Sequence, residues 1–251
     1  MSRVSHRMTR WKDCICRTVA LAMLACLAVF AIGTGSAAAQ DVSVGSYVTF
    51  GTYPQTAEGN DETPIEWLVL DREGDRALLL SRDSLDVHEF YPEHVDVTWE
   101  NSTLRAWLND DFLNRAFTAE EQAAILLTSL NNSSSQDYWQ TSGGGDTQDR
   151  IFALSYAEAY RYFGVAYKDS SHQEACAAPT DYAKAKGVRS AFVSYAPDGR
   201  KNHDWWLRSP GRAQSLASVV TGAGSLDCHG VESLTTCVRP ALWVDLTSGV
   251  L

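Results

Sequence analysis

Alternating apolar and polar residues mark the first part of the chain after residue 40. The stretch Val44–Gln55 alternates and is rich in aromatic and β-branched residues, which predicts a strand. Two further strand-like runs, residues 66–71 and 76–81, enclose the polar segment 72–76. The pattern therefore predicts a β-hairpin directly after the first strand.

Helical periodicity replaces this alternation in the middle of the chain. Leu104, Trp107 and Leu108 have i, i+3, i+4 spacing, which places them on one face of a predicted helix. Asn101 or Ser102 is the expected N-cap of this helix. Further helices are expected from the capping boxes 118–121 and 155–158, and a short one between Pro179 and Gly187.

The last quarter of the chain returns to strand patterns, in residues 192–211, 215–230 and 235–246. An order of strands, then helices, then strands predicts an α+β fold with helices segregated on an antiparallel sheet. The first and last strands are expected to pair. Large apolar residues are expected to dominate the core, among them Trp67, Trp107, Trp205, Trp243 and the leucines of residues 68–70 and 78–80.

The N-terminal 39 residues have the form of a secretory signal peptide. A basic leader is followed by an apolar run from about Thr18 to Ile32 and then by small residues, with cleavage expected after Ala39. The remaining residues, 40–251, are expected to form a single domain. This predicts a secreted or cell-envelope protein that does not insert into the membrane once the leader is removed.

Charge narrows the range of partners. The whole chain has a formal net charge of −10, and the leader holds five Lys/Arg and one Asp, so residues 40–251 have a net charge of −14. A domain this acidic is poorly suited to nucleic acid or anionic membrane surfaces. We therefore expect neither partner.

Three cysteines lie outside the leader: Cys176, Cys228 and Cys237. Cys228 and Cys237 flank a short loop, so a disulfide between them would close a hairpin and leave Cys176 free. A pairing of Cys176 with either of the others stays open. The spacing does not match a CxxC metal or redox motif.

The segment Trp205–Gly211, WWLRSPG, admits two interpretations. In the first, Trp206 is a stacking platform for a ligand and Arg208 binds an anionic group. In the second, which we favour, the tryptophans pack in the core and Arg208 forms a buried structural ion pair. Arg239 admits the same two interpretations, and the ion pair is again favoured.

The glycine-punctuated segment 213–237 is the best sequence-level candidate for a ligand surface, although an unliganded hairpin face explains it about as well. Its candidate ligand contacts, besides Trp206 and Arg208, are Ser218, Thr221, Asp227, His229 and Glu232.

Six blocks occur along the chain in a fixed order: FGTYPQ, PIEWLVLD, TWENSTLRAWLNDDFLNRAFTAEEQAAI, DRIFALSYAEAYRYF, WWLRSPG and VRPALWVDL. Together they resemble the bacterial family known as domain of unknown function 6273, from about Val44 to Leu246. The resemblance implies a C-type-lectin-like fold, which formylglycine-generating enzymes and variable ligand-binding proteins also have. Val238-Arg239-Pro240 resembles the closing-strand signature of that fold, with Cys237 where glycine is usual.

The resemblance defines the fold more firmly than the function. The triplets that calcium-dependent lectins use are absent, so calcium-dependent sugar binding is disfavoured. A formylglycine-generating enzyme would need two nearby cysteines upstream of the closing strand, and the spacing of Cys228 and Cys237 is wider than that. An oxidative enzyme of this type is therefore the minority alternative.

Other candidate chemistry is weaker still. His88, Glu89, Glu93 and His94 invite a zinc site, but Pro92 breaks the helical spacing that an HExxH-type motif needs. No metal, cofactor or catalytic residue is assigned. We predict a non-catalytic, exported module that binds a glycan, a peptide or a protein, with a structural envelope module as a second alternative.

Overall fold

The computed structural model describes residues 40–134, 137–188 and 194–251. The predicted leader, residues 1–39, lies outside the described residues. Within these three ranges, no helix has both the length and the apolar character needed to cross a membrane.

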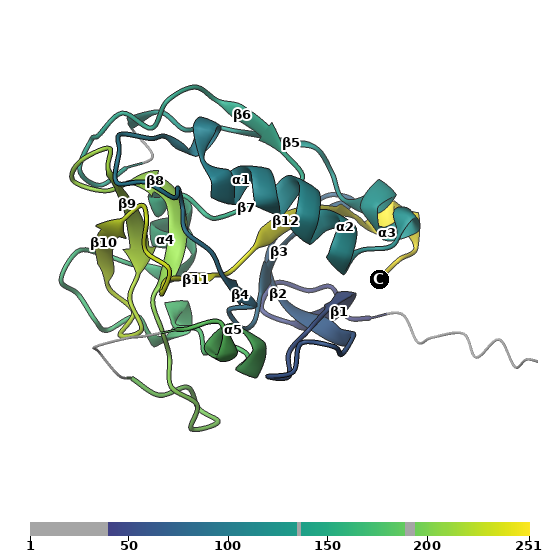
Figure 1. Ribbon diagram of the computed structural model, residues 1–251. Helices are drawn as coiled ribbons and strands as arrows, with labels where there is room; N and C mark the ends of the chain where they lie inside the picture. Colours follow the sequence, from purple (N-terminus) through teal and green to yellow (C-terminus); the bar gives the residue numbers. More distant parts are fainter. Residues whose placement is uncertain (1–39, 135–136, 189–193) are drawn as a thin grey trace, which may run out of the picture. The chain divides into compact units, whose positions relative to one another are not determined.

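One sheet unites the two ends of the described chain (Figure 1). Its strand order is β1-β2-β3-β12-β7, and every neighbouring pair is antiparallel. The strands are β1 (Tyr47–Tyr53), β2 (Thr63–Glu73), β3 (Arg76–Ser81), β12 (Ala241–Asp245) and β7 (Ile151–Phe152). The first and last strands therefore share a sheet, but the expectation that they pair is wrong, because β2 and β3 lie between β1 and β12.

A second five-stranded sheet has the order β10-β9-β8-β11-β4. Its strands are β10 (Leu226–Gly230), β9 (Leu216–Val220), β8 (Trp205–Pro210), β11 (Cys237–Val238) and β4 (Asp86–Val87). β8 and β11 run parallel, with Cys237 opposite Trp205, and the other pairs are antiparallel. The predicted strand before β8 is not formed over its described part, where Tyr195 makes only an isolated bridge to Lys201.

The remaining elements are short. β5 (Thr128–Leu130) and β6 (Thr147–Asp149) form a two-stranded sheet. The helices are α1 (Thr103–Trp107), the π-helical segment η2 (Leu108–Phe112), α2 (Leu113–Ala116), α3 (Ala119–Ala124), α4 (Tyr156–Phe163) and α5 (Asp181–Ala185), and the 3₁₀ turns are η1 (Trp99–Asn101), η4 (Gln173–Ala175) and η5 (Leu246–Ser248).

The helix starts follow the predicted caps. Ser102, not Asn101, caps α1, because its Oγ accepts a hydrogen bond from the backbone N–H of Arg105 at 3.1 Å. Both predicted capping boxes form, at the starts of α3 and α4. These caps satisfy backbone N–H groups that the first helical turn leaves without partners.

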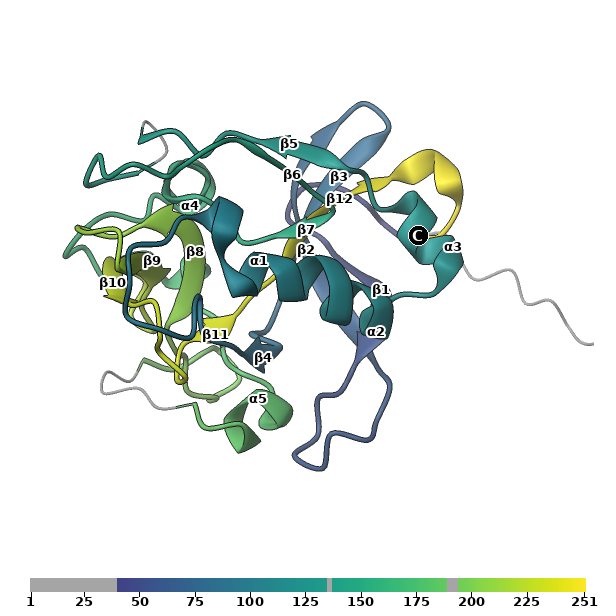
Figure 2. The ribbon, with the colours of Figure 1, turned by 45° about the horizontal axis from the view of Figure 1, so that its top comes forward.

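Each sheet has its own set of helices packed against it, as in an α+β fold. α2 contacts β1 and η2 contacts β7, whereas α4 contacts β8 and α5 contacts β4 (Figures 1 and 2). Gly51 makes the approach of α2 to β1 close. A Cβ atom at this position would lie 2.5 Å from the Phe117 ring and 2.7 Å from the Ala116 carbonyl oxygen, and the φ of Gly51 is +67°.

The core is rich in tryptophan. Trp67 and Trp205 are fully buried and Trp243 is 8% exposed, but Trp107 packs only at the edge of the core. Trp99 and Trp206 are also fully buried. The four fully buried indoles all donate a hydrogen bond, to Phe50 O (Trp67), Asp149 Oδ2 (Trp99), Ala175 O (Trp205) and His88 O (Trp206). Burying these large side chains therefore leaves no indole N–H without an acceptor.

Arg208 connects β8 to three other segments. Its guanidinium donates from Nη1 and Nη2 to the Glu158 carboxylate at 2.5 and 3.1 Å, while Nε donates to Asn132 Oδ1 and Nη1 to Ala153 O. The residue is 3% exposed. The structure thus agrees with the structural interpretation of Arg208 and not with its role as a ligand contact.

Glu158→Ala tests how much the Arg208–Glu158 pair contributes to the free energy of unfolding. The substitution leaves the buried Arg208 charge without a carboxylate and also opens the α4 capping box, so we expect a loss of about 3–5 kcal/mol in the free energy of unfolding. Glu121→Ala is the matched control. It opens the α3 capping box and removes a bond from Gly51 N, but uncovers no buried charge, so a loss of about 1–2 kcal/mol is expected. Equal losses in urea denaturation would contradict the role of the pair.

Candidate functional site

Two more of the predicted ligand contacts lie in the interior. Trp206 is fully buried in β8, with the Phe90 ring 5.8 Å from its own, so neither face of the indole is open to a ligand. Ser218 is fully buried in β9 and donates to Pro210 O at 2.7 Å. The prediction is wrong for both because β8 and β9 are interior strands of their sheet, and Trp206 and Ser218 lie in stretches that are buried on both faces.

The other predicted contacts remain at the surface of the β9–β10 hairpin. The Thr221 hydroxyl accepts from Ala223 N and Ser225 N and so closes the hairpin turn. Asp227 is exposed and accepts from Cys228 N at 2.9 Å. Glu232 is exposed and lies 2.9 Å from His94 Nδ1. The polar atoms of these side chains already bond to neighbouring groups, and the residues line none of the cavities described below.

His229 belongs to a chain of hydrogen-bonding groups that superficially resembles a catalytic triad. Its Nδ1 lies 2.8 Å from Thr236 Oγ1 and its Nε2 lies 3.2 Å from Asp204 Oδ2. Asp204 also accepts from Gly222 N at 2.7 Å. However, Thr236 is 1% exposed, so its hydroxyl has no access to a substrate. The arrangement links the β9–β10 hairpin to the segment before β11.

All three cysteines outside the leader are free thiols in the structure. The predicted disulfide between Cys228 and Cys237 is not formed, because β9 and β8 lie between the strands that carry them. Three inter-strand steps of about 4.8 Å exceed the reach of a disulfide. Burial raises the pKa of both thiols.

The His/Glu segment before η1 forms ordinary polar contacts. His88 Nδ1 lies 2.7 Å from Glu89 O, and His94 pairs with Glu232. Over the ranges that the structure describes, no group of three or more His, Cys, Asp or Glu side chains is placed to hold a metal ion.

A cavity of about 480 Å³ is the best-defined candidate site. It lies between the first sheet, at Tyr47 and Leu68, and the segments 173–178 and 196–202. Its polar lining includes Arg82, Asp83, Glu174, Cys176, Asp198, Arg200, Asn202 and Arg239. Residues far apart in the sequence therefore meet here at the junction of the two sheets.

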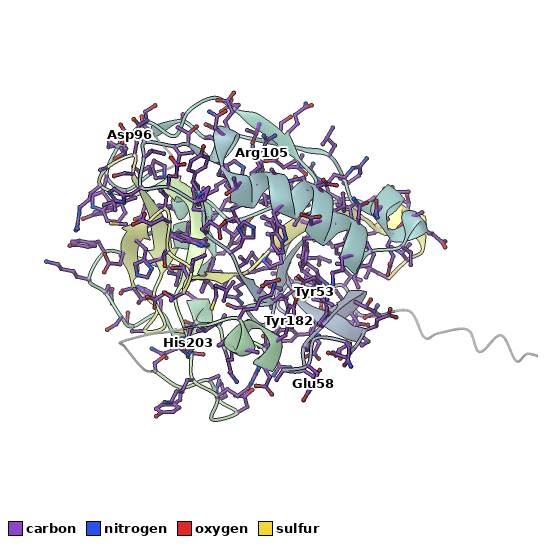
Figure 3. The ribbon with its side chains drawn as sticks, in the orientation of Figure 1. Tyr53, Glu58, Asp96, Arg105, Tyr182 and His203 are labelled. Atoms are coloured by element: carbon purple, nitrogen blue, oxygen red, sulfur yellow. The ribbon has the colours of Figure 1, made fainter. Side chains whose placement is uncertain are left out.

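Backbone bonds hold the end of segment 173–178 and the following turn against the connection between β3 and β4. Ser84 N donates to Ala178 O and Thr180 N donates to Ser84 O, both at 3.0 Å. The helix α5 that follows is anchored by Tyr182, whose ring lies 5.8 Å from Tyr53 in an edge-on contact (Figure 3). These contacts fix one wall of the cavity.

Arg239 is the distinctive residue of the cavity. It is 3% exposed, donates from Nε to Ser81 O at 2.8 Å and from Nη1 to Ala175 O at 3.0 Å, and its guanidinium lies 5.1 Å from the centre of the Trp205 ring. No carboxylate of the described residues lies within 4.0 Å of it. The expectation of a structural ion pair is therefore wrong for Arg239, and burial lowers its pKa to about 10.

The sequence points to Arg239 but not to the residues that surround it. Cys176, Asp83 and Arg200 line the same cavity from separate loops. The only available signal was an arginine in an otherwise apolar closing strand, since the rest of the site depends on long-range contacts.

An aromatic cluster forms a second feature of the surface. The Tyr138 ring lies 5.3 Å from Trp139 and 5.7 Å from both Tyr156 and Tyr167, and Tyr138 is 45% exposed. The neighbouring Asp137 is 2% exposed. Its Oδ2 accepts from Thr141 N at 2.7 Å, while its Oδ1 has no hydrogen-bond partner among the residues that the structure describes. Burial raises the pKa of Asp137 to about 6.

Comparison with known proteins assigns this α+β domain to a family. Residues 74–246 match the family described as Domain of unknown function (DUF6273). The chain therefore belongs to that family. No curated protein and no solved structure matches the chain significantly.

The raised pKa of Asp137 predicts a pH-dependent stability. An unfolded aspartate releases its proton near pH 4, whereas folded Asp137 keeps its proton up to about pH 6. The folded state binds more protons in this window, so Asp137 makes stability fall as pH rises from about 4 to 6, by at most about 1.4 kcal/mol per pH unit.

Asp137→Asn should remove this contribution, so the difference in unfolding free energy between variant and wild type should change across pH 4–6. Exposed Asp227→Asn provides the control and should give a much flatter difference. Parallel pH profiles of wild type and Asp137→Asn in urea titrations would contradict the assignment.

Proposed function

We propose that this protein is an exported, non-catalytic binding module with a C-type-lectin-like fold, and that its ligand is a glycan, a peptide or a protein. The basic, apolar and then alanine-rich order of residues 1–39 supports export to the cell envelope or beyond. The presence of β1 and β12 in one sheet, with long connecting segments outside it, supports the lectin-like assignment.

The observation that carries the binding proposal is the cavity lined by Arg239. A cavity of about 480 Å³ falls in the size range of ligand sites, and convergent polar groups in such a cavity are typical of them. A buried guanidinium without a carboxylate partner is costly to the fold, and a bound ligand that hydrogen-bonds to it would offset that cost.

The oxidative-enzyme alternative receives no comparable support. It needs two cysteines that act together, but Cys228 and Cys237 lie on strands separated by two others. The exchange of electrons between two thiols requires their sulfur atoms to approach to bonding distance.

Ala196→Trp tests the cavity as the binding site. Ala196 is partly exposed and lines the cavity, so an indole there should fill it without disturbing the core. Wild-type protein is applied to glycan and peptide arrays, and any signal should fall at least about tenfold in the variant.

Ala185→Trp is the control, because Ala185 is exposed on α5 and does not line the cavity. It should retain the wild-type signal. Blank arrays with wild-type protein would favour a structural envelope module, and a signal that survives Ala196→Trp would place the ligand elsewhere.

A further inference from the structure

The cavity contains three arginines, of which two already have carboxylate partners. Arg82 Nη1 lies 2.7 Å from Glu66 Oε2. Arg200 donates to both oxygens of Asp83, at 2.6 and 2.9 Å, and its Nε donates to Asp198. Arg239 is therefore the cavity arginine whose charge no described carboxylate neutralises at close range.

The hydrogen bonds of Arg239 leave part of its guanidinium unused. Nε and Nη1 donate to backbone carbonyls, but Nη2 has no acceptor among residues 40–134, 137–188 and 194–251. A guanidinium presents its N–H groups as a planar fork that matches the two oxygens of a carboxylate. The unused nitrogen belongs to a side chain that lines the cavity and is 97% buried, with 3% of its surface exposed.

Arg208 shows which group a buried guanidinium binds elsewhere in this fold. It is equally buried and lies at another cavity of about 480 Å³, but there Glu158 occupies the fork through both oxygens. Arg239 has no residue in the position that Glu158 holds for Arg208. A carboxylate from outside the chain would complete it in the same way.

The charges around the opening restrict the anion further. Glu174 is exposed and lines the cavity, together with Asp83 and Asp198, which both pair with Arg200. A phosphate with two negative charges would meet stronger repulsion from these acidic side chains than a carboxylate with one, while either group could pair with Arg239.

We propose that the cavity binds a ligand through a carboxylate group, with Arg239 as the residue that pairs with it. This inference rests on the proposed binding function and names its ligand chemistry. Small organic acids, the C-terminus of a peptide and an acidic sugar all carry the group.

Cys176 provides a built-in reporter, because it lines the same cavity. Iodoacetate and iodoacetamide both alkylate a thiolate at carbon and release iodide, but only iodoacetate carries a carboxylate. Cys228 is an internal reference, since it is also partly buried and its pKa is also raised by burial. Alkylation of each peptide is followed by mass spectrometry at pH 8.5.

We expect the ratio of iodoacetate to iodoacetamide rates to be roughly tenfold higher at Cys176 than at Cys228, as a charge-assisted pair would give. Arg239→Gln should remove this excess, while Arg161→Gln, which breaks an exposed pair with Asp71 outside the cavity lining, should keep it. Equal ratios at the two cysteines in wild-type protein would overturn the proposal.

A competition experiment in wild-type protein does not depend on how the Arg239 variant folds. Propionate should slow the alkylation of Cys176 by neutral iodoacetamide, with no effect at Cys228, and isosteric propionamide should slow neither. N-acetylglycine and glucuronate then separate a peptide-like from a sugar-like source of the carboxylate. Equal protection by propionate and propionamide would contradict a role for charge.

The two proposals fail separately. If array binding is lost in Ala196→Trp but Cys176 shows no carboxylate preference, the cavity binds a ligand of other chemistry. If Cys176 prefers carboxylates but the arrays stay blank, the ligand chemistry stands and the binding partner is a small acid rather than an arrayed glycan or peptide.

Discussion

The guanidinium of Arg208 holds together segments that the backbone ladders leave apart. A bulge in β8 directs the backbone N–H of Arg208 to Leu154 O instead of β9, and the side chain then reaches the first turn of α4. Asn132, which binds Nε, also donates to Gly145 O and Thr147 Oγ1. One buried charge thus ties the middle strand of the second sheet to α4 and to the β5–β6 connection, and removing Glu158 leaves that charge uncompensated.

Arg239 occupies a comparable depth in the fold but has a different set of partners. Two carbonyls and the face of Trp205 offset only part of the cost of removing a charge from water. A purely structural role would be served at lower cost by a neutral donor. Arg208 and Arg239 therefore differ in one respect. The chain itself supplies a carboxylate partner for Arg208, whereas Arg239 lies beside a cavity without such a partner among the described residues.

Features encoded within a few residues were predictable, and features encoded by distant pairing were not. The capping boxes at Thr118 and Ser155 and the β2–β3 hairpin depend on neighbours in the sequence. The burial of Trp206 depends on β8 becoming a middle strand, and WWLRSPG contains no information about its neighbours. Likewise, Cys228 and Cys237 lie nine positions apart in sequence, yet the parallel pairing of β11 with β8 carries them to different parts of the sheet.

Whether a polar residue belongs to a binding site also depends on its partners in three dimensions. The side chains of the β9–β10 hairpin can hydrogen-bond, but Thr221 closes its own turn and His229 lies between Asp204 and Thr236. Polar atoms that already have good partners gain little from a ligand, because each new bond replaces an existing one. A buried donor with an unused N–H group gains the most free energy from a bond to a ligand. Only the three-dimensional arrangement reveals which donor that is. The candidate site is therefore the cavity beside Arg239 and not the glycine-punctuated hairpin.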